Sequence, residues 1–402
     1  MTFSFVPTRA AGLSELADFV PHAGRDYAAG RNYDYGPGGR TNVSALSPYI
    51  RHRLVTEAEV VKATLAVHSP TAAEKFVQEV FWRTYWKGWL ELRPEAWRRY
   101  RTDVARQLPD ADGAYLDAVA GRTGIDCFDA WAAELVETGY LHNHTRMWFA
   151  SIWIFTLRLP WQLGADFFLR HLYDGDPASN TLSWRWVAGL QTAGKTYLAT
   201  AENISRYTEG RFSPAGLATS AVALTEEPLP SPAPLDDARS VPTGRVGLLL
   251  HDDDLYPESL FSEISEATRV GAVAGFRAVT GRSPASVSQP VIDFTHEAMT
   301  DALARAGDHL DVPGTAFDEL SMAAVLDWAT GADVATIITP YAPIGPAQEQ
   351  LAGLGSELAD SGIALVPVRR RWDSLAWPHA RRGYFGFREN IPQFIRQQGL
   401  GR

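Results

Sequence analysis

The sequence predicts an α + α/β protein, in which an all-helical domain is followed by a Rossmann-like α/β domain with a parallel sheet. Apolar residues recur every three or four positions from Leu13 to about Phe212, which is helical periodicity. After residue 245, short apolar runs alternate with helical segments. With 402 residues, of which 46% are hydrophobic, the chain can bury more than one core.

The helical pattern of the first part is clear at several places. Phe76 and Val80 share one helix face, as do Phe128 and Trp131, because residues three or four apart lie on the same side of a helix. We therefore assign residues 1–212 to the helical domain.

A linker and a second domain follow. Residues 213–245, SPAGLATSAVALTEEPLPSPAPLDDARSVPTGR, are rich in proline and small residues, which predicts an extended segment. The predicted strands are Val246–Leu250, Val270–Val279, Val334–Thr339 and Ile363–Val368. The predicted helices are Pro257–Ala267, Asp293–Ala306, Phe317–Ala329 and Pro346–Asp360. This alternation favours a parallel sheet covered on both faces, over residues 246–402.

Composition excludes several classes of protein. No stretch reaches the ~18 uninterrupted apolar residues of a membrane span, and the longest, Met147–Leu157, ends at Arg158. The N-terminus MTFSFVPTRA has no apolar signal region, and Cys127 is the only cysteine. We therefore expect a cytoplasmic protein without disulfides and without a four-cysteine iron–sulfur cluster.

The charge distribution bears on possible partners. The net charge of −10 disfavours nucleic-acid binding, which needs lysine and arginine. Residues 1–212 carry 23 basic and 23 acidic side chains, whereas residues 213–402 carry 14 and 24. The first part could therefore still hold a basic stripe, or its clustered arginines could be ordinary solvated charge. These arginines are Arg25, Arg31, Arg40, Arg51 and Arg53.

Four motifs follow one another between Thr138 and Trp186. They are TGYLHNHTRM, a tryptophan at position 161, DGDPASN and WRW. In order and spacing they resemble TGWMHNRxRM, Trp, DGDxAxN and WxW of the DNA photolyase and cryptochrome family. The resemblance implies that the helical domain binds FAD.

The same resemblance implies which residues bind the flavin. NVSALSPYI, residues 42–50, resembles the family's TSxLSPYL, with Val43 in place of a threonine. A turn of this kind before a helix suits a diphosphate, although alone it would be an ordinary helix start. The implied cofactor-binding residues are Ser44, Leu46, Ser47, Arg83, Asn143, Arg146, Asp174, Asp176 and Asn180.

Two of these residues have more specific implied roles. Arg146 would stabilise the anionic reduced flavin, and Asn180 would lie opposite the flavin N5 atom. His144 stands where the family has an arginine, which leaves open a structural role or a proton-transfer role. Two aspartates in a turn could also suggest a metal, but no further ligand cluster supports one, so we expect none.

Another segment carries the implied substrate site. QEVFWRTYWKGW, residues 78–89, resembles the family's ELxWRxF helix. This match implies that Glu79, Trp82, Met147 and Trp186 face a substrate cavity, with Trp82 as a flat surface for a base. Without the resemblance, the segment would be an aromatic core stripe with a surface ion pair.

Photoreduction of a buried flavin needs a chain of oxidisable rings. The resemblance implies that Trp184 is the inner and Trp161 the middle ring of this relay. The outermost position falls near Leu108, where no tryptophan occurs. Tyr140, Trp97 and Trp131 remain candidates for that position.

The second part resembles the antenna-type α/β domain that photolyases carry first, so that the chain is expected to be circularly permuted. The likeness rests on element order and on the segments DHLDVPGTAFDEL and RRGYFGFRENIPQF. LLLHDDDLYPESL departs from the family's RxDLRxxDN, and Thr339, Pro340 and Tyr341 stand at its NxEY. A second, antenna chromophore is therefore unsupported.

The resemblance implies a deoxyribodipyrimidine photo-lyase, a monomeric C–C lyase in which reduced FAD passes a light-driven electron to a pyrimidine dimer in DNA. The dimer must be flipped out of the duplex to reach a buried flavin. One alternative is a cryptochrome-like blue-light photoreceptor without repair activity, which the negative charge favours. Another is a flavoprotein whose altered HDDDL and TPY segments serve a different partner.

Overall fold

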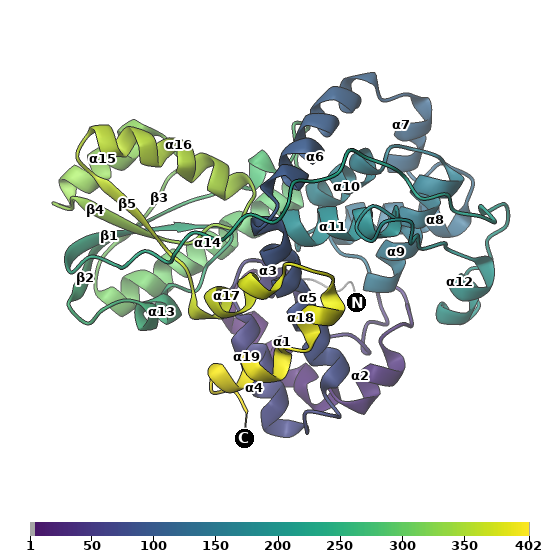
Figure 1. Cartoon of the computed structure of the whole chain (residues 1–402), viewed down its shortest axis with the longest axis horizontal. Coiled ribbons are helices and arrows are strands. Elements are labelled where there is room, and N and C mark those ends of the chain that lie inside the picture. Colours follow the sequence, from purple (N-terminus) through teal and green to yellow (C-terminus); the bar gives the residue numbers. More distant parts are fainter. Residues whose placement is uncertain (1–4, 402) are drawn as a thin grey trace.

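The computed structural model describes residues 5–401, which form a helical part and an α/β part that pack against each other (Figure 1). The helices of the first part are α1 (Arg9–Phe19), α2 (Arg25–Gly30), α3 (Ser47–Arg51), α4 (Glu57–Val67), α5 (Glu74–Glu91), α6 (Pro94–Gln107), α7 (Gly113–Val119), α8 (Asp126–Thr138), α9 (Asn143–Ser151), α10 (Trp161–His171), α11 (Pro177–Val187) and α12 (Ala201–Tyr207). A π-helical turn, Ile152–Thr156, continues α9.

The second part alternates strands and helices and ends in three short helices. These elements are β1 (Gly244–His251), α13 (Pro257–Leu260), β2 (Thr268–Phe276), α14 (Gln289–Leu310), β3 (Gly314–Ala316), α15 (Met322–Gly331), β4 (Thr336–Pro340), α16 (Pro346–Asp360), β5 (Ala364–Val368), α17 (Arg371–Ala376), α18 (Tyr384–Arg388) and α19 (Ile391–Gln397). The predicted fold class, a helical domain followed by a parallel-sheet α/β domain, is confirmed.

The sheet has the order β3-β2-β1-β4-β5, and all of its pairs are parallel. α13 and α14 lie on one face, and α15 and α16 on the other (Figure 1). Leu248 and Leu250 of β1 join the core on the α14 side, whereas Leu249 joins the cluster under α15 and α16. Successive side chains of a strand point to opposite faces, so a continuous apolar run fills both layers.

One strand was not expected. β3 has three residues, all exposed, and lies at the sheet edge beside β2. Its sequence, Gly-Thr-Ala after a proline, carries no apolar run, so only pairing with β2 makes it a strand.

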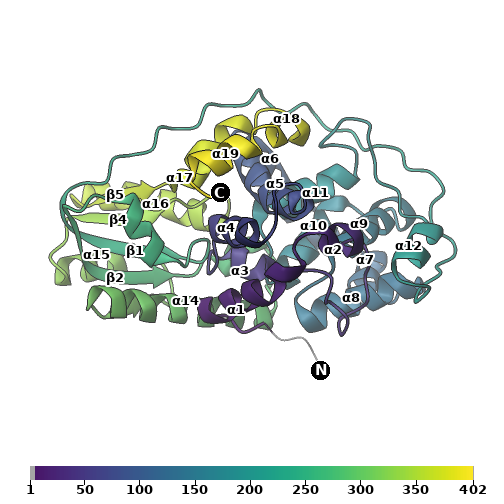
Figure 2. The same cartoon turned by 90° about the horizontal axis from the view of Figure 1, so that it is seen from below.

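The linker takes a long path. Residues 213–242 contain no helix or strand and cross the outside of the molecule from the helical part to β1 (Figures 1 and 2). Hydrogen bonds hold it to the helical part, from Leu224 N to Ala188 O at 3.0 Å and from Ala233 N to Leu92 O at 2.9 Å.

The three C-terminal helices return to the helical part and lie along α5 (Figure 2). Trp372 donates a hydrogen bond from Nε1 to Thr84 Oγ1 at 3.0 Å, and Tyr384 donates one from its hydroxyl to Gln78 O at 2.8 Å. Their aromatic side chains extend the core around α5, although the sequence grouped them with the α/β domain. No helix within residues 5–401 is long and apolar enough to cross a membrane.

Candidate functional site

A buried acidic turn joins α10 to α11. Asp176 begins α11 as its N-cap and accepts a hydrogen bond from Ser179 N at 2.7 Å, and Pro177 occupies the first helical position. Asp174 and Asp176 are only 5% and 3% exposed. Two carboxylates at such depth require nearby cations or strong hydrogen bonds.

Three cations from two helices meet this turn. Arg83 and Lys87, one helical turn apart on α5, lie 3.8 and 3.7 Å from Asp176 Oδ2. Arg146 of α9 donates to Asp174 Oδ2 at 2.9 Å. Arg146 also donates from Nε to Leu141 O at 3.0 Å, which fixes its orientation.

These cations keep the carboxylates ionised. Burial alone would raise the pKa of Asp174, but Arg146 beside it holds that pKa below its ordinary value. Burial alone would also raise the pKa of Asp176, but the charges of Lys87, Arg83 and Arg51 hold that pKa far below its ordinary value. The turn is therefore negatively charged, within a shell of positive groups.

Several buried polar atoms at this turn have no hydrogen-bond partner within the protein. They are Arg83 Nη1, Lys87 Nζ, Asp174 Oδ1, Ser179 Oγ and Thr181 Oγ1. Buried donors and acceptors are rarely left unpaired, so the cluster is suited to a ligand that offers both kinds of group. FAD does so, since its phosphates and ribose hydroxyls could meet the cations and Asp174.

The predicted flavin-binding residues lie partly together. Ser47 lies near Asp174 and helps to lower its pKa, and Asn180 donates from Nδ2 to Ala165 O at 2.8 Å. Ser44 and the buried Leu46 flank Ala45, whose φ of 47° makes a tight turn before α3. Asn143, in contrast, is exposed at the start of α9.

Three of the four residues predicted to face a substrate have partners of their own. Glu79 forms an ion pair with Arg31, and burial raises the pKa of its carboxyl. The Trp82 ring lies flat on Tyr384 of α18, with centroids 3.5 Å apart and planes 11° apart. Trp186 stacks on Tyr197 at 5.7 Å. Met147 is half-buried on α9.

His144, which replaces the family's arginine, is held at both ring nitrogens. Nδ1 lies 2.9 Å from Asn32 O, Nε2 lies 3.1 Å from the Tyr197 hydroxyl, and the ring packs on Trp148 at 4.1 Å. Burial lowers the pKa of His144. These contacts favour the structural role.

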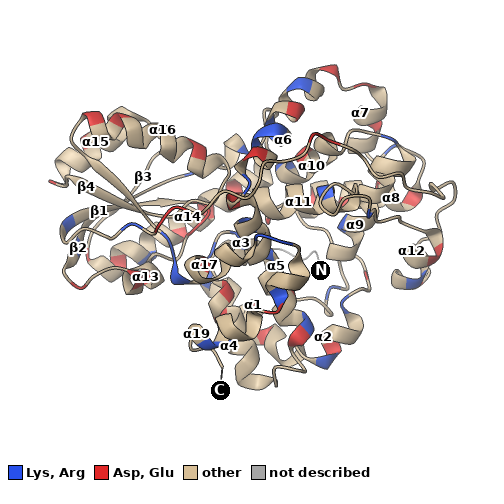
Figure 3. Cartoon of the chain, viewed as in Figure 1, with Lys and Arg blue, Asp and Glu red and all other residues tan. Residues whose placement is uncertain are grey.

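Four of the five arginines that could have formed a basic stripe are paired with carboxylates. Arg31 and Arg40 pair with Glu79 and Glu134, while Arg51 and Arg53 are each 2% exposed and paired with aspartates of the α/β part. Carboxylates distant in sequence neutralise these arginines, which the sequence alone could not show. α6 carries both acidic and basic residues (Figure 3).

A second cluster of charges lies at the carboxyl end of β1, next to β4, where open α/β sheets commonly bind ligands. Asp254 accepts hydrogen bonds from Arg370 at 2.6 and 2.7 Å and from Arg53 at 3.2 Å. Arg53 also donates two hydrogen bonds to Asp373, at 2.8 and 2.7 Å, and Arg51 pairs with Asp253. We call this group the interdomain cluster. Its signal in the sequence was the aspartate run HDDDL after a strand.

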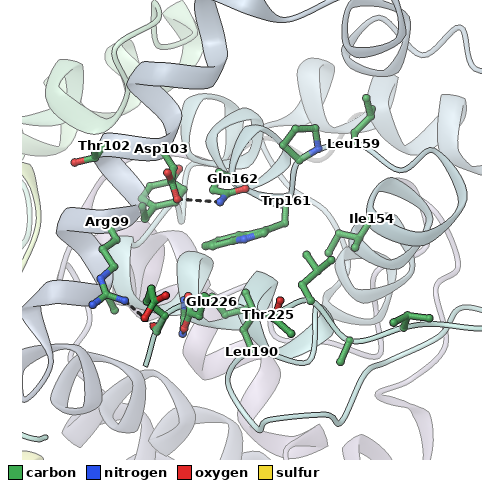
Figure 4. Close-up of a pocket in the computed structure, with 18 of the residues that line it drawn as sticks. Arg99, Thr102, Asp103, Ile154, Leu159, Trp161, Gln162, Leu190, Thr225 and Glu226 are labelled. Carbon is green, nitrogen blue, oxygen red and sulfur yellow. Dashed lines mark hydrogen bonds and ion pairs between the residues drawn. The ribbon is translucent and has the colours of Figure 1, made fainter. Parts of the chain in front are cut away.

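A hollow lies elsewhere, between α6, α10 and linker residues 220–227, with a volume of about 1290 Å³ (Figure 4). Trp161 lies in its wall, beside Gln162, which donates to Asp103 at 3.1 Å. Among residues 5–401, no group of three or more His, Cys, Asp or Glu side chains is arranged to hold a metal ion.

Comparison with known proteins agrees with this geometry. Residues 76–212 match the family described as the FAD binding domain of DNA photolyase. A deoxyribodipyrimidine photo-lyase of Streptomyces griseus is 38% identical over 150 residues, 37% of this chain and 32% of that protein. One from Agrobacterium fabrum is 31% identical over 190 residues, 46% of this chain and 39% of that protein.

Solved structures give a weaker likeness. The crystal structure of a class III photolyase from Agrobacterium tumefaciens is 27% identical and has a TM-score of 0.43, covering 50% of this chain and 43% of that one. A Synechocystis cryptochrome is 23% identical with a TM-score of 0.45, covering 52% of this chain and 44% of that one.

The helical part of the chain thus contains a flavin-binding domain. Over residues 76–212, about a third of the chain, it is similar to the FAD binding domain of DNA photolyase. The matches with the two curated relatives span about a third and two-fifths of their length.

Proposed function

We propose that this protein is a light-driven DNA repair enzyme that acts on pyrimidine dimers as a monomer in the cytoplasm. The observation that supports it best is the buried cluster at Asp174 and Asp176, whose unpaired polar groups suit FAD. When bound and reduced, FAD would supply the photoexcited electron that splits a flipped-out dimer.

In this proposal the chain's own residues bind and tune the flavin. Ser44, Leu46 and Ser47 would form the turn that holds the diphosphate, with Arg83, Asp174 and Asp176 at the ribose and ring edge. Arg146 would place a positive charge beside the ring, where it favours the anionic form. Asn180 has one amide hydrogen bonded to Ala165 O, so its remaining amide hydrogen and its carbonyl oxygen could serve N5.

The order of the two domains forms part of the proposal. The α/β domain would follow the helical domain as a circular permutation of the usual arrangement. The long linker and the return of α17–α19 to α5 support this, since both ends of the α/β part lead back to the helical part. We propose no antenna chromophore, because the chain's own arginines fill the end of the sheet beside β1.

One observation favours the alternative, a blue-light photoreceptor without repair activity. Tyr384 covers the ring of Trp82, the surface proposed for a dimer base. The net charge of −10 also lowers affinity for DNA. A repair enzyme would have to displace Tyr384 or bind the dimer beside it.

A repair assay separates the two functions. FAD-loaded, reduced protein is illuminated with blue light in the presence of an oligonucleotide that contains one thymine dimer, and restored thymines are measured by ultraviolet absorbance. We expect restoration in light and none in the dark. Flavin photoreduction without restored thymines would favour the photoreceptor.

The variant Tyr384→Ala sharpens this assay. Freeing the face of Trp82 should increase dimer binding and repair, whereas Phe385→Ala, at a neighbouring side chain that is 74% exposed, should change neither. If Tyr384→Ala restores no thymines although its flavin photoreduces normally, the repair proposal is wrong.

A further inference from the structure

We propose that Trp97, reached through Tyr100 and bonded to Glu349 of the α/β domain, is the outer end of the electron relay. The proposal rests on the proposed function, since the relay serves a photoreduced flavin. It supplies the ring that is missing at Leu108, and it gives the α/β domain a part in photoreduction.

The inner part of the path follows α10. The Trp184 ring rests on Gly164, where an added Cβ would lie 2.3 Å from Trp184 Cη2. Trp161 precedes Gly164 by three residues on the same helix, so it lies one turn along the same face. Both indoles are buried, at 2% and 6% exposure.

Beyond Trp161 the aromatic contacts lead in one direction. Its ring stacks on Tyr100 of α6 at 5.8 Å and 29°, and Tyr100 packs on Trp97 at 5.2 Å and 33°. These are ordinary distances for aromatic rings in contact. Three rings thus form a continuous ladder from α10 to the edge of the helical part.

The other candidates lie on different paths. Tyr140 contacts the ring of Phe5 and the guanidinium groups of Arg40 and Arg146. Trp131 packs between Trp148 and Phe212. Within residues 5–401, neither ring has an aromatic contact with Trp161.

The nearby carboxylate favours Trp97 over Tyr100 as the ring that stays oxidised. Trp97 Nε1 donates to Glu349 Oε1 at 2.7 Å, and a carboxylate there stabilises a positive indole and can accept its proton. Arg101 lies 5.6 Å from the Trp97 ring and opposes this, but it also lies 4.0 Å from the same carboxylate. The buried Tyr100 hydroxyl has no hydrogen-bond partner, so it cannot pass on a proton and acts as a bridge.

The electron and proton steps then balance. Trp184 would give one electron to a bound, photoexcited flavin. Trp161 would then reduce the oxidised Trp184, and Trp97 would reduce the oxidised Trp161 through Tyr100. The oxidised Trp97 passes its indole proton to Glu349. An external thiol then gives one electron to Trp97, Glu349 returns the indole proton, and the thiol releases its own proton to water and becomes a thiyl radical. Trp97 borders a hollow of about 440 Å³ between the two domains, through which a small thiol can approach.

The test is transient absorption spectroscopy of the FAD-loaded full chain with dithiothreitol as the thiol. We expect Trp97→Phe to retain early tryptophan oxidation, to lose the long-lived tryptophan radical, and to photoreduce more slowly. Glu349→Gln should slow the loss of the indole proton, which is measured as the decay of the tryptophan cation absorbance. We expect a roughly tenfold slower decay, because a factor of ten corresponds to the free energy of one charge-assisted hydrogen bond.

Trp131→Phe is the matched control, because it removes an equally buried indole outside the ladder. Its radical lifetime and photoreduction rate should equal those of the unaltered protein. If the protein photoreduces its flavin and Trp97→Phe and Glu349→Gln leave the radical signals unchanged, the relay proposal is overturned and the proposed function stands. A protein that takes up no FAD overturns both.

Discussion

Asp174 and Asp176 in the helical part, and Asp253 and Asp254 at the end of β1, are all buried beside cations, but the polar groups around them differ. At the first pair, Asp174 Oδ1 and the nearby Lys87 Nζ have no hydrogen-bond partner. Asp254 instead receives three hydrogen bonds from arginines of the same chain. Asp174 therefore keeps an oxygen that a ligand could bond, whereas at the second cluster the unpaired atoms are Arg51 Nη1, Arg53 Nε and Glu57 Oε1 and the aspartates are paired within the protein.

This difference separates binding from assembly. A buried charge is costly until it is paired, so the interdomain cluster stabilises only the arrangement in which Arg51 and Arg53 of the helical part meet the aspartates of β1. At the cluster around Asp174, a bound molecule would have to supply the missing partners of the buried polar groups. A matched pair of substitutions can distinguish the two situations.

Arg53→Met should have the largest effect. It leaves Asp373 without both of its short hydrogen bonds and weakens the pairing of Asp254 and Glu57. We expect the free energy of unfolding of the FAD-free protein to fall by about 3–5 kcal/mol, the cost of an uncompensated buried charge. The midpoint of urea unfolding measures this change.

Lys87→Met is its counterpart in the ligand cluster. Asp176 keeps Arg83 nearby, and an ammonium group without a hydrogen bond is removed from the interior. The FAD-free protein should change by less than about 1 kcal/mol, while FAD affinity, measured by flavin fluorescence, should fall at least ~10-fold. Equal destabilisation by the two substitutions would remove the distinction between the clusters.

Much of this organisation could be predicted from the sequence. The apolar runs predicted β1, β2, β4 and β5 within a few residues, because a parallel strand buried on both faces is continuously apolar. The order of the motifs predicted the FAD-binding domain that residues 76–212 match. The position of α16, Pro346–Asp360, was predicted at both ends, since proline begins it and a glycine closely follows it.

The remainder depended on contacts between distant segments. Nothing local in HDDDL says that its aspartates meet Arg51 and Arg53, about 200 positions earlier. Tyr384 covers Trp82 from a helix roughly 300 positions further along the chain. Lys87 was missed although it lies one helical turn after Arg83, a spacing that could have indicated it.

Glu91 gives a pH-dependent test of the interdomain contact. Its carboxylate accepts hydrogen bonds from the Tyr341 hydroxyl at 2.7 Å and from Ile344 N at 2.6 Å, but it forms no ion pair within residues 5–401. Burial raises its pKa to about 7 from an ordinary value of 4.5. Between these values the folded protein keeps a proton that the unfolded chain has lost, so Glu91 makes stability fall as the pH rises towards 7.

Glu91→Gln should remove this contribution. An amide carries no charge to bury, and its oxygen can still accept one of the two hydrogen bonds. Relative to the unaltered protein, the variant should gain stability as the pH rises from 4.5 to above 7, by on the order of 3 kcal/mol. Urea unfolding at several pH values measures the difference, and parallel pH profiles would show that Glu91 titrates normally.

Ser179→Ala should give the smallest effect and test the ligand cluster most directly. The Ser179 hydroxyl is buried without a partner, whereas its backbone N–H, which an alanine keeps, caps α11 on Asp176. Stability of the FAD-free protein should therefore stay within about 0.5 kcal/mol, and FAD affinity should fall roughly fivefold, the worth of one neutral hydrogen bond.

Thr200→Ala also removes one hydroxyl, but we expect the opposite result from that of Ser179→Ala. The Thr200 hydroxyl caps α12 by accepting from Asn203 N at 3.2 Å, so its loss should cost about 1 kcal/mol of stability and leave FAD affinity unchanged. A hydroxyl that already has a protein partner contributes to folding, and one that lacks a partner contributes once the ligand arrives. If Ser179→Ala behaves like Thr200→Ala, the Ser179 hydroxyl has a protein partner after all and the ligand lies elsewhere.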